Sequence, residues 1–327
     1  MSYQQLKPLM KKVGCRASAE EFQDRVNVVF HDFEAAHYDV HHSDMWDSLK
    51  DQIDLLVADV LTFFGYVPSR LQLLDIGCGT GLSTQLLLQS KLGPEIVHIS
   101  LLDSSPNMLK QAELKATKWN KPYKLINGYL SSVTDTFDVV IISSVLHHIP
   151  DLKIFLQQVD SVIRAGGILI HLQDPNGDYL ADPDYVMRKQ EYDLHKENRK
   201  GSSAKSLIPK PILRYINRLL NRKDYIDRIN DQLLKEGTIT KRMSADEIWS
   251  VTDIHVETPS ETKNKGISIK FLTEQLVNFD LVSLRSYAFY GDLKSSLPEP
   301  YREREQGYIN TAQINGRNIA GVWVKKS

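Results

Sequence analysis

The chain has 327 residues, of which 42% are hydrophobic and 25% are charged, and its formal net charge is −1. This composition is typical of an ordinary soluble globular protein, and the balanced charge indicates no particular partner. With two cysteines, Cys15 and Cys78, no apolar stretch long enough to span a bilayer and no signal-peptide pattern, we expect a cytoplasmic protein that lacks a disulfide framework and a membrane-spanning helix.

Residues 1–67 predict a helical N-terminal cap. Ser18 and Glu21 have the spacing of a capping box, and apolar residues at helical spacing follow from Phe22 to Phe30. A second helix is expected over Trp46–Phe64, whose apolar residues recur on one face.

From Leu71 onward, short apolar runs alternate with helical patterns. The runs expected to be strands are Leu71–Ile76, Ile96–Leu102, Tyr123–Ile126, Phe137–Ser143 and Gly167–Leu172. The helices expected between them are Leu82–Gln89, Pro106–Lys118 and Leu152–Ile163. Buried apolar strands that alternate with helices predict βαβ units and a parallel sheet.

Charged, amphipathic helical patterns replace this alternation over residues 178–265, where Ser244 and Glu247 form another capping-box pattern. A helix over Ile267–Phe279 and strands over Leu281–Tyr290 and Asn318–Lys325 are expected after it. The predicted plan is an α/β fold with four parts. These are a cap (1–67), a Rossmann-like core (68–177), a helical insertion that acts as a lid (178–265) and the C-terminal part of the core sheet (266–327).

A glycine-rich sequence, Gly77-Cys78-Gly79-Thr-Gly81, follows the first expected strand and opens a helix. Glycines at such a turn let a ligand approach the backbone, although a tight turn without a ligand would also use them. Dinucleotide-binding turns favour G-x-G-x-x-G, and Gly81 comes one position too early for that pattern. The acid that precedes the loop, Asp75, suits a cationic cofactor better than a pyrophosphate.

The second expected strand ends in an acid, Asp103. An acid at this position of a Rossmann-like fold can accept hydrogen bonds from ribose hydroxyls. Its alternative role is a helix cap, because Pro106 begins the next helix.

With these motifs, the chain from Leu71 to Asp174 resembles the class I S-adenosylmethionine-dependent methyltransferases, in particular the branch that acts on small molecules. Met108 after Asp103, and Val145–Ile149 after the fourth strand, are further matches. The resemblance implies a seven-stranded sheet whose last, antiparallel strand lies within Ile314–Val324.

The resemblance also implies S-adenosyl-L-methionine as the cofactor. Asp75 and the loop glycines would hold its amino-acid end, Asp103 would hold its ribose, and Met108 would pack near its adenine. The complete set of implied cofactor residues is Asp75, Gly77, Cys78, Gly79, Gly81, Asp103, Ser104, Met108, Asn127, Gly128, Tyr129, Ser143 and Ser144.

One position departs from the family pattern. The family often has Gly-Asp after the third strand, where the acid contacts the adenine amine, but this chain has Gly128-Tyr129. Asn127 or a backbone group would then recognise adenine. If Tyr129 blocks the adenine site, the protein is a catalytically silent cofactor-binding protein.

Four residues are candidates for the chemistry: His147, His148, Asp174 and Tyr38. The two histidines and Asp174 follow strands at the carboxyl edge of the sheet, where ligands bind in such folds, and a histidine suits a general base. Tyr38 matches a cap that covers the cofactor in related enzymes. Each of the four has packing or turn formation as its alternative role. Adjacent histidine side chains are expected to diverge, so no metal site is predicted.

Residues 188–223 contain 11 Lys or Arg against three acids. A solvated helix face explains such a stretch, and so does a surface for an acidic or carrier-bound substrate. Nucleic acid is disfavoured because aromatic residues are sparse there.

The leading hypothesis is methyl transfer to an oxygen, nitrogen or carbon of a small molecule, such as a natural-product intermediate. An RNA or protein methyltransferase is the first alternative, weakened by the absence of an Asn/Asp-Pro-Pro-Tyr/Phe tetrapeptide after the fourth strand. An NAD-dependent oxidoreductase and the silent cofactor-binding protein are the others.

Overall fold

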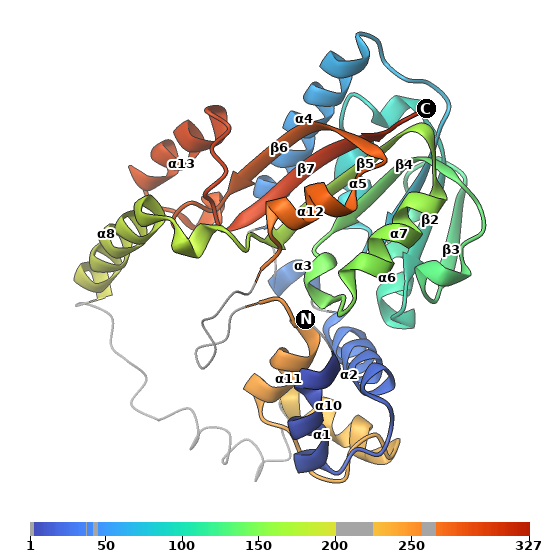
Figure 1. Ribbon diagram of the computed structural model, residues 1–327, viewed down its shortest axis with the longest axis vertical. Coiled ribbons are helices and arrows are strands. Elements are labelled where there is room, and N and C mark those ends of the chain that lie inside the picture. The colour runs from blue at the N-terminus through green and yellow to red at the C-terminus, as the bar shows by residue number, and fades with distance from the viewer. Residues whose placement is uncertain (1–2, 37, 42–44, 201–224, 257–265) are drawn as a thin grey trace.

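The computed structural model describes residues 3–36, 38–41, 45–200, 225–256 and 266–327. Its centre is one seven-stranded sheet in the order β3-β2-β1-β4-β5-β7-β6 (Figure 1). The strands are β1 (Leu71–Ile76), β2 (Ile96–Asp103), β3 (Tyr123–Asn127), β4 (Phe137–Ser143), β5 (Ile163–Pro175), β6 (Phe279–Tyr287) and β7 (Asn318–Lys325).

The strand directions confirm the predicted Rossmann-like sheet. Neighbouring strands among β1 to β5 are parallel, whereas β7 is antiparallel to both β5 and β6. β5 is longer than predicted, because Ile163 pairs with Phe137 of β4 at one end and Pro175 pairs with Asn318 of β7 at the other.

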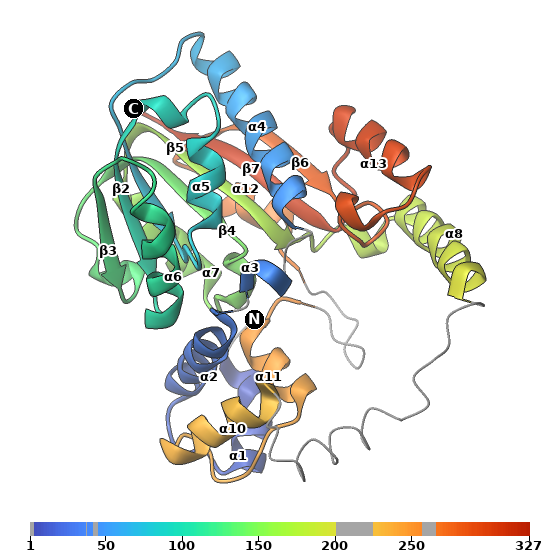
Figure 2. The same ribbon diagram turned by 180° about the vertical axis from the view of Figure 1, so that it is seen from behind.

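Helices cover both faces of the sheet because successive strand residues point to opposite sides. Leu73 belongs to the apolar cluster under α4 (Met45–Phe64), α5 (Leu82–Leu88) and α6 (Pro106–Ala116). Leu74 belongs to the cluster under α7 (Leu152–Val162) and α12 (Ile269–Gln275). Figure 1 shows the α7 and α12 face, and Figure 2 shows the opposite one.

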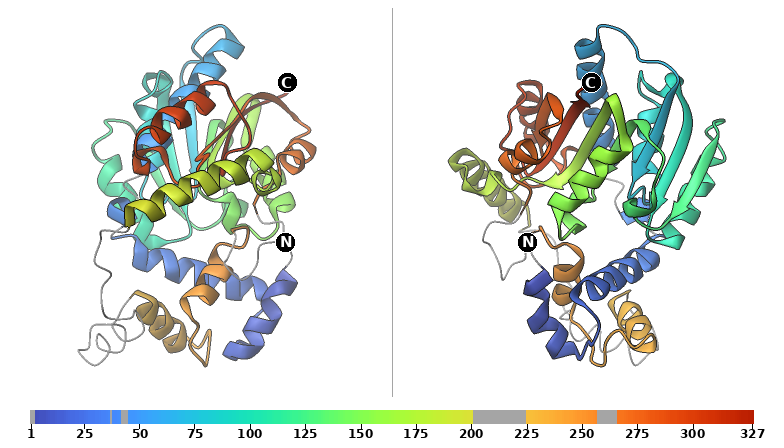
Figure 3. Two further views of the ribbon diagram at one scale, coloured as in Figure 1. Left: turned by 90° about the vertical axis from the view of Figure 1, so that its left-hand side faces the viewer. Right: turned by 45° about the vertical axis from the view of Figure 1, so that its right-hand side comes forward.

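A second helical body, here called the cap, lies beside the sheet (Figure 3). It consists of α1 (Lys7–Val13), α2 (Ala19–Glu34), α10 (Tyr225–Lys235) and α11 (Ala245–Thr252), which share one apolar cluster. Both predicted capping boxes are confirmed: Glu21 N–H donates to Ser18 Oγ at 3.1 Å, and Glu247 N–H donates to Ser244 Oγ at 3.2 Å.

The cap therefore combines two segments that the sequence analysis kept apart. α2 buries Phe22 and Val26 in the same cluster as Ile229 of α10 and Ile248 of α11. α4 also departs from the predicted grouping, because its apolar face packs on the sheet rather than on α2.

The predicted insertion (178–265) does not form a single unit, because α10 and α11 belong to the cap whereas its first helix lies elsewhere. α8 (Pro183–Lys200) lies beside α13 (Tyr301–Asn310), where Tyr192 packs against Tyr290 and Tyr301 (Figure 3). The part of the predicted amphipathic pattern that falls within residues 201–224 lies outside the described residues.

Short elements complete the described chain: η1 (Tyr3–Leu6), α3 (Tyr38–His41), η2 (Gly93–Glu95), η3 (Leu130–Ser132), η4 (Leu146–His148), η5 (Tyr179–Ala181) and η6 (Lys294–Ser296). Within the described ranges, every helix is too short or too polar to cross a membrane.

Candidate active site

A cavity of about 640 Å³ opens where the carboxyl ends of the first four strands meet the cap. Ligands bind at this edge of open α/β sheets. Ten of the thirteen residues implied as cofactor contacts line it: Gly77, Cys78, Gly79, Asp103, Ser104, Met108, Gly128, Tyr129, Ser143 and Ser144. Tyr38 and His148 line it as well.

The glycine loop between β1 and α5 exposes its backbone to this cavity. Gly77, Gly79 and Gly81 have φ values of 64°, 52° and 79°, which only glycine adopts readily. A Cβ on Gly79 would meet no atom within 4 Å, whereas a Cβ on Gly77 would lie 2.5 Å from Val145. Gly79 is thus the place where a ligand can approach the chain most closely, while Gly77 serves the packing of the turn.

Asp75 lies beneath the loop rather than on the cavity lining. Its side chain is fully buried, and its Oδ2 accepts hydrogen bonds from Ser83 Oγ at 2.7 Å and Thr84 Oγ1 at 2.6 Å. Burial raises the pKa of Asp75 to about 6, against these two hydrogen bonds. Asp75 therefore joins the end of β1 to the start of α5.

Asp103 holds the same loop from the cavity side. Its Oδ2 accepts the N–H of Gly79 at 2.8 Å, and its Oδ1 accepts the N–H of Ser105 at 2.8 Å. Burial raises the pKa of Asp103 although both N–H groups favour its charged form. Because each carboxylate oxygen has two lone pairs, both can accept a further hydrogen bond from a ligand hydroxyl.

The residues at the end of β3 and just after it do not fill the cavity. Asn127, which is not on the lining, donates through Nδ2 to the carbonyls of Asp103 at 3.1 Å and Ser104 at 3.2 Å. The Tyr129 hydroxyl donates to Asp24 of α2, and half of the Tyr129 residue surface is exposed. Tyr129 thus connects the core to the cap at the rim.

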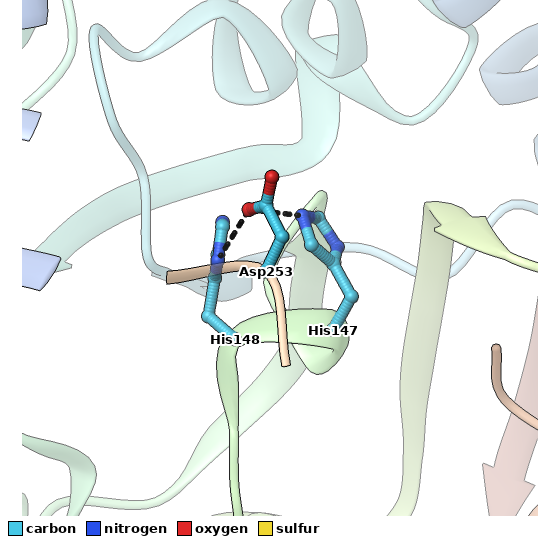
Figure 4. A group of neighbouring side chains, drawn as sticks. All are labelled: His147, His148 and Asp253. Atoms are coloured by element: carbon cyan, nitrogen blue, oxygen red, sulfur yellow. Dashed lines mark ion pairs between the residues drawn. The ribbon is translucent and has the colours of Figure 1, made fainter. Parts of the chain in front are cut away.

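The two histidines of η4 converge, and the expectation that adjacent side chains diverge was wrong for this pair. Their ring centroids are 4.0 Å apart. His147 Nδ1 lies 2.8 Å from Asp174 Oδ1, while His148 Nδ1 lies 2.9 Å from the Thr252 carbonyl oxygen. These partners turn both rings toward Asp253 at the end of α11 (Figure 4).

The pKa values of the two imidazoles shift in opposite directions, although burial lowers both. Burial disfavours the charged form of His147, but the hydrogen bond and charge of Asp174 outweigh it and raise the His147 pKa. Burial and the neighbouring His147 and His31 hold the pKa of His148 well below its usual value. Asp174 is fully buried behind His147, and neither residue lines the cavity.

Tyr38, the remaining candidate for the chemistry, belongs to α3. It lines the cavity together with Asp103, and burial raises the pKa of its hydroxyl.

Sequence reasoning missed the wall that α2 contributes. The residues of α2 on the lining are Glu20, Glu21, Gln23, Asp24, Asn27 and His31. They recur every three or four positions opposite the apolar stripe, so the polar half of the same helical pattern was the available signal.

The lining is acidic. Five carboxylate residues line the cavity, and none of the described lining residues is a lysine or arginine: the acids are Glu20, Glu21, Asp24, Asp103 and Asp151. A cation is the kind of ligand that such a field favours.

The central part of the chain also matches a known family. Residues 74–169 match the family model described as a methyltransferase domain. The matched residues run from β1 to β5, so the similarity lies in the part of the chain that carries the glycine loop and Asp103.

Two curated methyltransferases are similar in sequence to this part of the chain. It is 32% identical over 102 residues to a ubiquinone biosynthesis O-methyltransferase of Mesorhizobium japonicum, covering 30% of this chain and 39% of that protein. It is 32% identical over 132 residues to a demethylmenaquinone methyltransferase of Bacillus licheniformis, covering 39% of this chain and 53% of that protein. The match thus spans about two fifths to one half of the length of these relatives.

Among solved structures, an S-adenosylmethionine-dependent methyltransferase from Clostridium acetobutylicum aligns over 90% of this chain and 98% of its own. The TM-score is 0.45 and the sequence identity is 12%.

Proposed function

We propose that this methyltransferase domain transfers the methyl group of S-adenosyl-L-methionine to an oxygen, nitrogen or carbon atom of a small molecule. The observation that carries the proposal is the cavity in which the glycine loop, Asp103 and the acidic face of α2 meet. The names of the two relatives, a ubiquinone biosynthesis O-methyltransferase and a demethylmenaquinone methyltransferase, support a small-molecule substrate.

The chemistry of the lining fits this cofactor. The open space at Gly79 accommodates a ligand against the backbone, and the lone pairs of Asp103 suit ribose hydroxyls. The acidic lining favours a sulfonium cation and opposes the pyrophosphate of a nicotinamide dinucleotide. The cofactor supplies an electrophilic methyl group when it is bound.

The chain itself contributes binding, orientation and exclusion of water. Gly79 and Asp103 would hold the amino-acid and ribose parts, and Met108, which is 2% exposed, would pack near the base. Asp75 would act through the loop that it braces. We assign recognition of adenine to the backbone around Gly128, because Asn127 faces Asp103 and Ser104 instead.

The four candidates for the chemistry lie on or beside the cavity lining, where they would act on the nucleophile of the substrate. His148 and Tyr38 reach the lining, so they are the residues that can touch a substrate hydroxyl or amine. His147 and Asp174 lie behind them and would act as positioning residues, through the contact between the two tilted imidazoles.

The acidic or carrier-bound substrate is a finer proposal that depends on the basic stretch. Its described residues face other partners: Arg188 donates to carbonyls of Phe289 and Asn315, Lys189 pairs with Asp193, and Lys196 pairs with Asp292. Support for such a substrate would have to come from residues 201–223, which lie outside the described residues.

Both cysteines are unpaired, which supports a reducing compartment such as the cytoplasm.

The test combines one substitution with an activity screen. Gly79→Ala should abolish binding of S-adenosylhomocysteine in calorimetry, because the new methyl occupies the space of the ligand. Gly65→Ala is the matched control, since Gly65 also has a positive φ of 71° and open space around its Cβ. Both variants bear a similar backbone strain of about 1–2 kcal/mol, so only the ligand distinguishes them.

Transfer of isotope-labelled methyl groups to metabolite extracts then identifies the substrate. Equal binding by the Gly79→Ala, Gly65→Ala and unmodified proteins would refute the cofactor site. Binding without transfer to any extract would favour the silent cofactor-binding protein.

A further inference from the structure

We propose that His147, His148 and Asp253 bind one transition-metal dication of the Zn²⁺ type, and that the open position of this ion faces the cavity. Binding of the ion does not depend on the proposed function, whereas binding of a substrate oxygen to the ion rests on that function. The three residues come from both bodies of the molecule, because η4 belongs to the core and Asp253 ends α11 of the cap.

The three donor atoms already lie near one point (Figure 4). Asp253 Oδ1 is 3.3 Å from His148 Nδ1 and 3.9 Å from His147 Nε2, and all three ligand atoms lie within 4.8 Å of one another. Zn²⁺ holds nitrogen and oxygen ligands at about 2.0–2.2 Å, so tetrahedral ligand atoms are about 3.3 Å apart. One of the three distances has this value, a second is 3.9 Å, and the third, between the two imidazole nitrogens, is within 4.8 Å, so the side chains must close up around the ion.

Asp174 supports His147 as it would support a metal ligand. The 2.8 Å contact of Asp174 Oδ1 with Nδ1 places the imidazole proton on that nitrogen and directs the lone pair of Nε2 toward Asp253. The same Oδ1 accepts the backbone N–H of His147 at 3.1 Å, which fixes the ring further. Histidines that bind metals usually donate their other N–H to a carboxylate in this way.

The charge of the group calls for a cation. Asp174 is fully buried and the Asp253 side chain is 31% exposed, and in the described chain neither forms an ion pair with lysine or arginine. Asp174 Oδ2 is buried and makes no hydrogen bond to any described residue. Two carboxylates whose ion-pair partners in the described chain are imidazoles leave negative charge in a poorly solvated place, which costs free energy unless a cation is bound.

His148 connects the ion to the cavity. Its Nδ1 donates a proton to the Thr252 carbonyl oxygen at 2.9 Å, so this proton moves to Nε2 of the neutral ring when Nδ1 binds the ion. His148 lines the cavity, so the fourth coordination position opens there, as in zinc sites that take a water or a substrate atom. A hydroxyl or phenol oxygen of the substrate is the chemical class that this position would hold.

The experiment uses untagged full-length protein, cleared of metal with a chelator and titrated with Co²⁺. Four-coordinate Co²⁺ reports on its site through visible d–d absorption. We expect one Co²⁺ per chain, its displacement by Zn²⁺, and a higher melting temperature when Zn²⁺ is present, because an ion that binds only the folded state stabilises it.

Substitutions assign the site. His147→Gln and Asp253→Asn should abolish the visible absorption, and Asp174→Asn should weaken binding about 10–100-fold. His98→Gln, which changes a histidine near the start of β2, is the matched control and should bind like the unmodified protein. Melting curves without metal and calorimetry with S-adenosylhomocysteine show that each variant is folded.

Two results overturn the cation site: no Co²⁺ binding by the unmodified protein, or binding that survives in both His147→Gln and Asp253→Asn. A protein that binds Co²⁺ as expected but not S-adenosylhomocysteine would contradict the proposed function and leave the cation site standing.

Discussion

The carboxylate of Asp103 holds the glycine loop and also faces the space that we propose for the cofactor. It accepts two backbone N–H groups, one from the glycine loop and one from the turn before α6, and it also faces the cavity. The second β-strand therefore determines the shape of the turn that follows the first one. A substitution at Asp103 should affect both the loop and the ligand.

We expect Asp103→Asn to weaken S-adenosylhomocysteine binding about tenfold to a hundredfold or more, since a hydrogen bond to a charged group contributes about 1.5–3 kcal/mol. Asp138→Asn is the control, because Asp138 also accepts two hydrogen bonds, from Gln72 N–H and Arg164, at the other end of the strands. Calorimetry measures both affinities. Equal losses in the two variants would mean that Asp103 acts through folding stability alone.

The imidazoles of η4 allow a second prediction at the residue scale. His148→Gln should lower kcat about 10²–10⁴-fold while S-adenosylhomocysteine still binds, because it removes a group that contacts the nucleophile. In assays without added metal, His147→Gln and Asp174→Asn should lower kcat less, since there they act through His148. Near-normal kcat in all three variants would leave proximity and orientation as the source of catalysis.

At the scale of elements, one helix serves two purposes. α2 buries its apolar stripe in the cap and turns its polar stripe toward the cavity. The capping box at Ser18 and Glu21 sets where this helix begins and therefore which residues face the ligand. The stability of the cap and the shape of the cavity wall thus depend on the same element.

α13 allows a prediction about stability and pH. Glu305 of α13 is fully buried and accepts the N–H groups of Ala288 and Phe289, which follow β6. Burial raises the pKa of Glu305 to about 7, against the effect of these hydrogen bonds, from a reference value of 4.5.

A raised carboxyl pKa means that the folded state binds more protons than the unfolded state between these two values. The contribution of Glu305 to the free energy of unfolding should therefore fall by about 3 kcal/mol as the pH rises from 4.5 to about 7. Glu305→Gln cannot ionise, so its stability should fall less over this range. Urea unfolding at several pH values measures the difference, and parallel pH profiles of the two proteins would refute the assignment.

At the scale of the whole molecule, the cavity lies between two bodies that touch through polar contacts. Tyr129 bonds to Asp24, Ser105 Oγ donates to Asp32 at 2.6 Å, and Gln23 donates to the His148 carbonyl at 3.1 Å. Such contacts exchange readily with water, unlike the apolar cluster inside the cap. We therefore place the predicted lid motion in the cap as a body.

Hydrogen exchange tests this closure. Exchange in α2 and α11 should slow when S-adenosylhomocysteine and substrate are added together, because a ligand that binds the closed state better shifts the molecule toward it. α13 serves as the internal control and should not change. Exchange in α2 that is already slow without ligand, and unchanged with it, would show that the cap is a rigid wall.

The sequence alone determined the sheet and the loop, because both depend on local patterns. Apolar runs of strand length, the glycine spacing and the capping boxes each act within a few residues of chain. Their predicted ends were therefore close, as for β1, β4 and β7. The family resemblance, rather than local patterning, implied the thirteen cofactor residues; apart from Met108 in α6, the ten that line the cavity stand at strand ends that a parallel sheet brings to one edge.

Only the tertiary structure decided which distant segments meet. α2 packs with α10 and α11, more than 190 residues later in the chain, because their apolar stripes complement one another, and a stripe by itself does not name its partner. That packing brings Asp253 beside His147 and His148 and turns the two imidazoles together. Sequence spacing determines where a side chain is attached, but the hydrogen-bond partners supplied by the fold determine the direction in which it points.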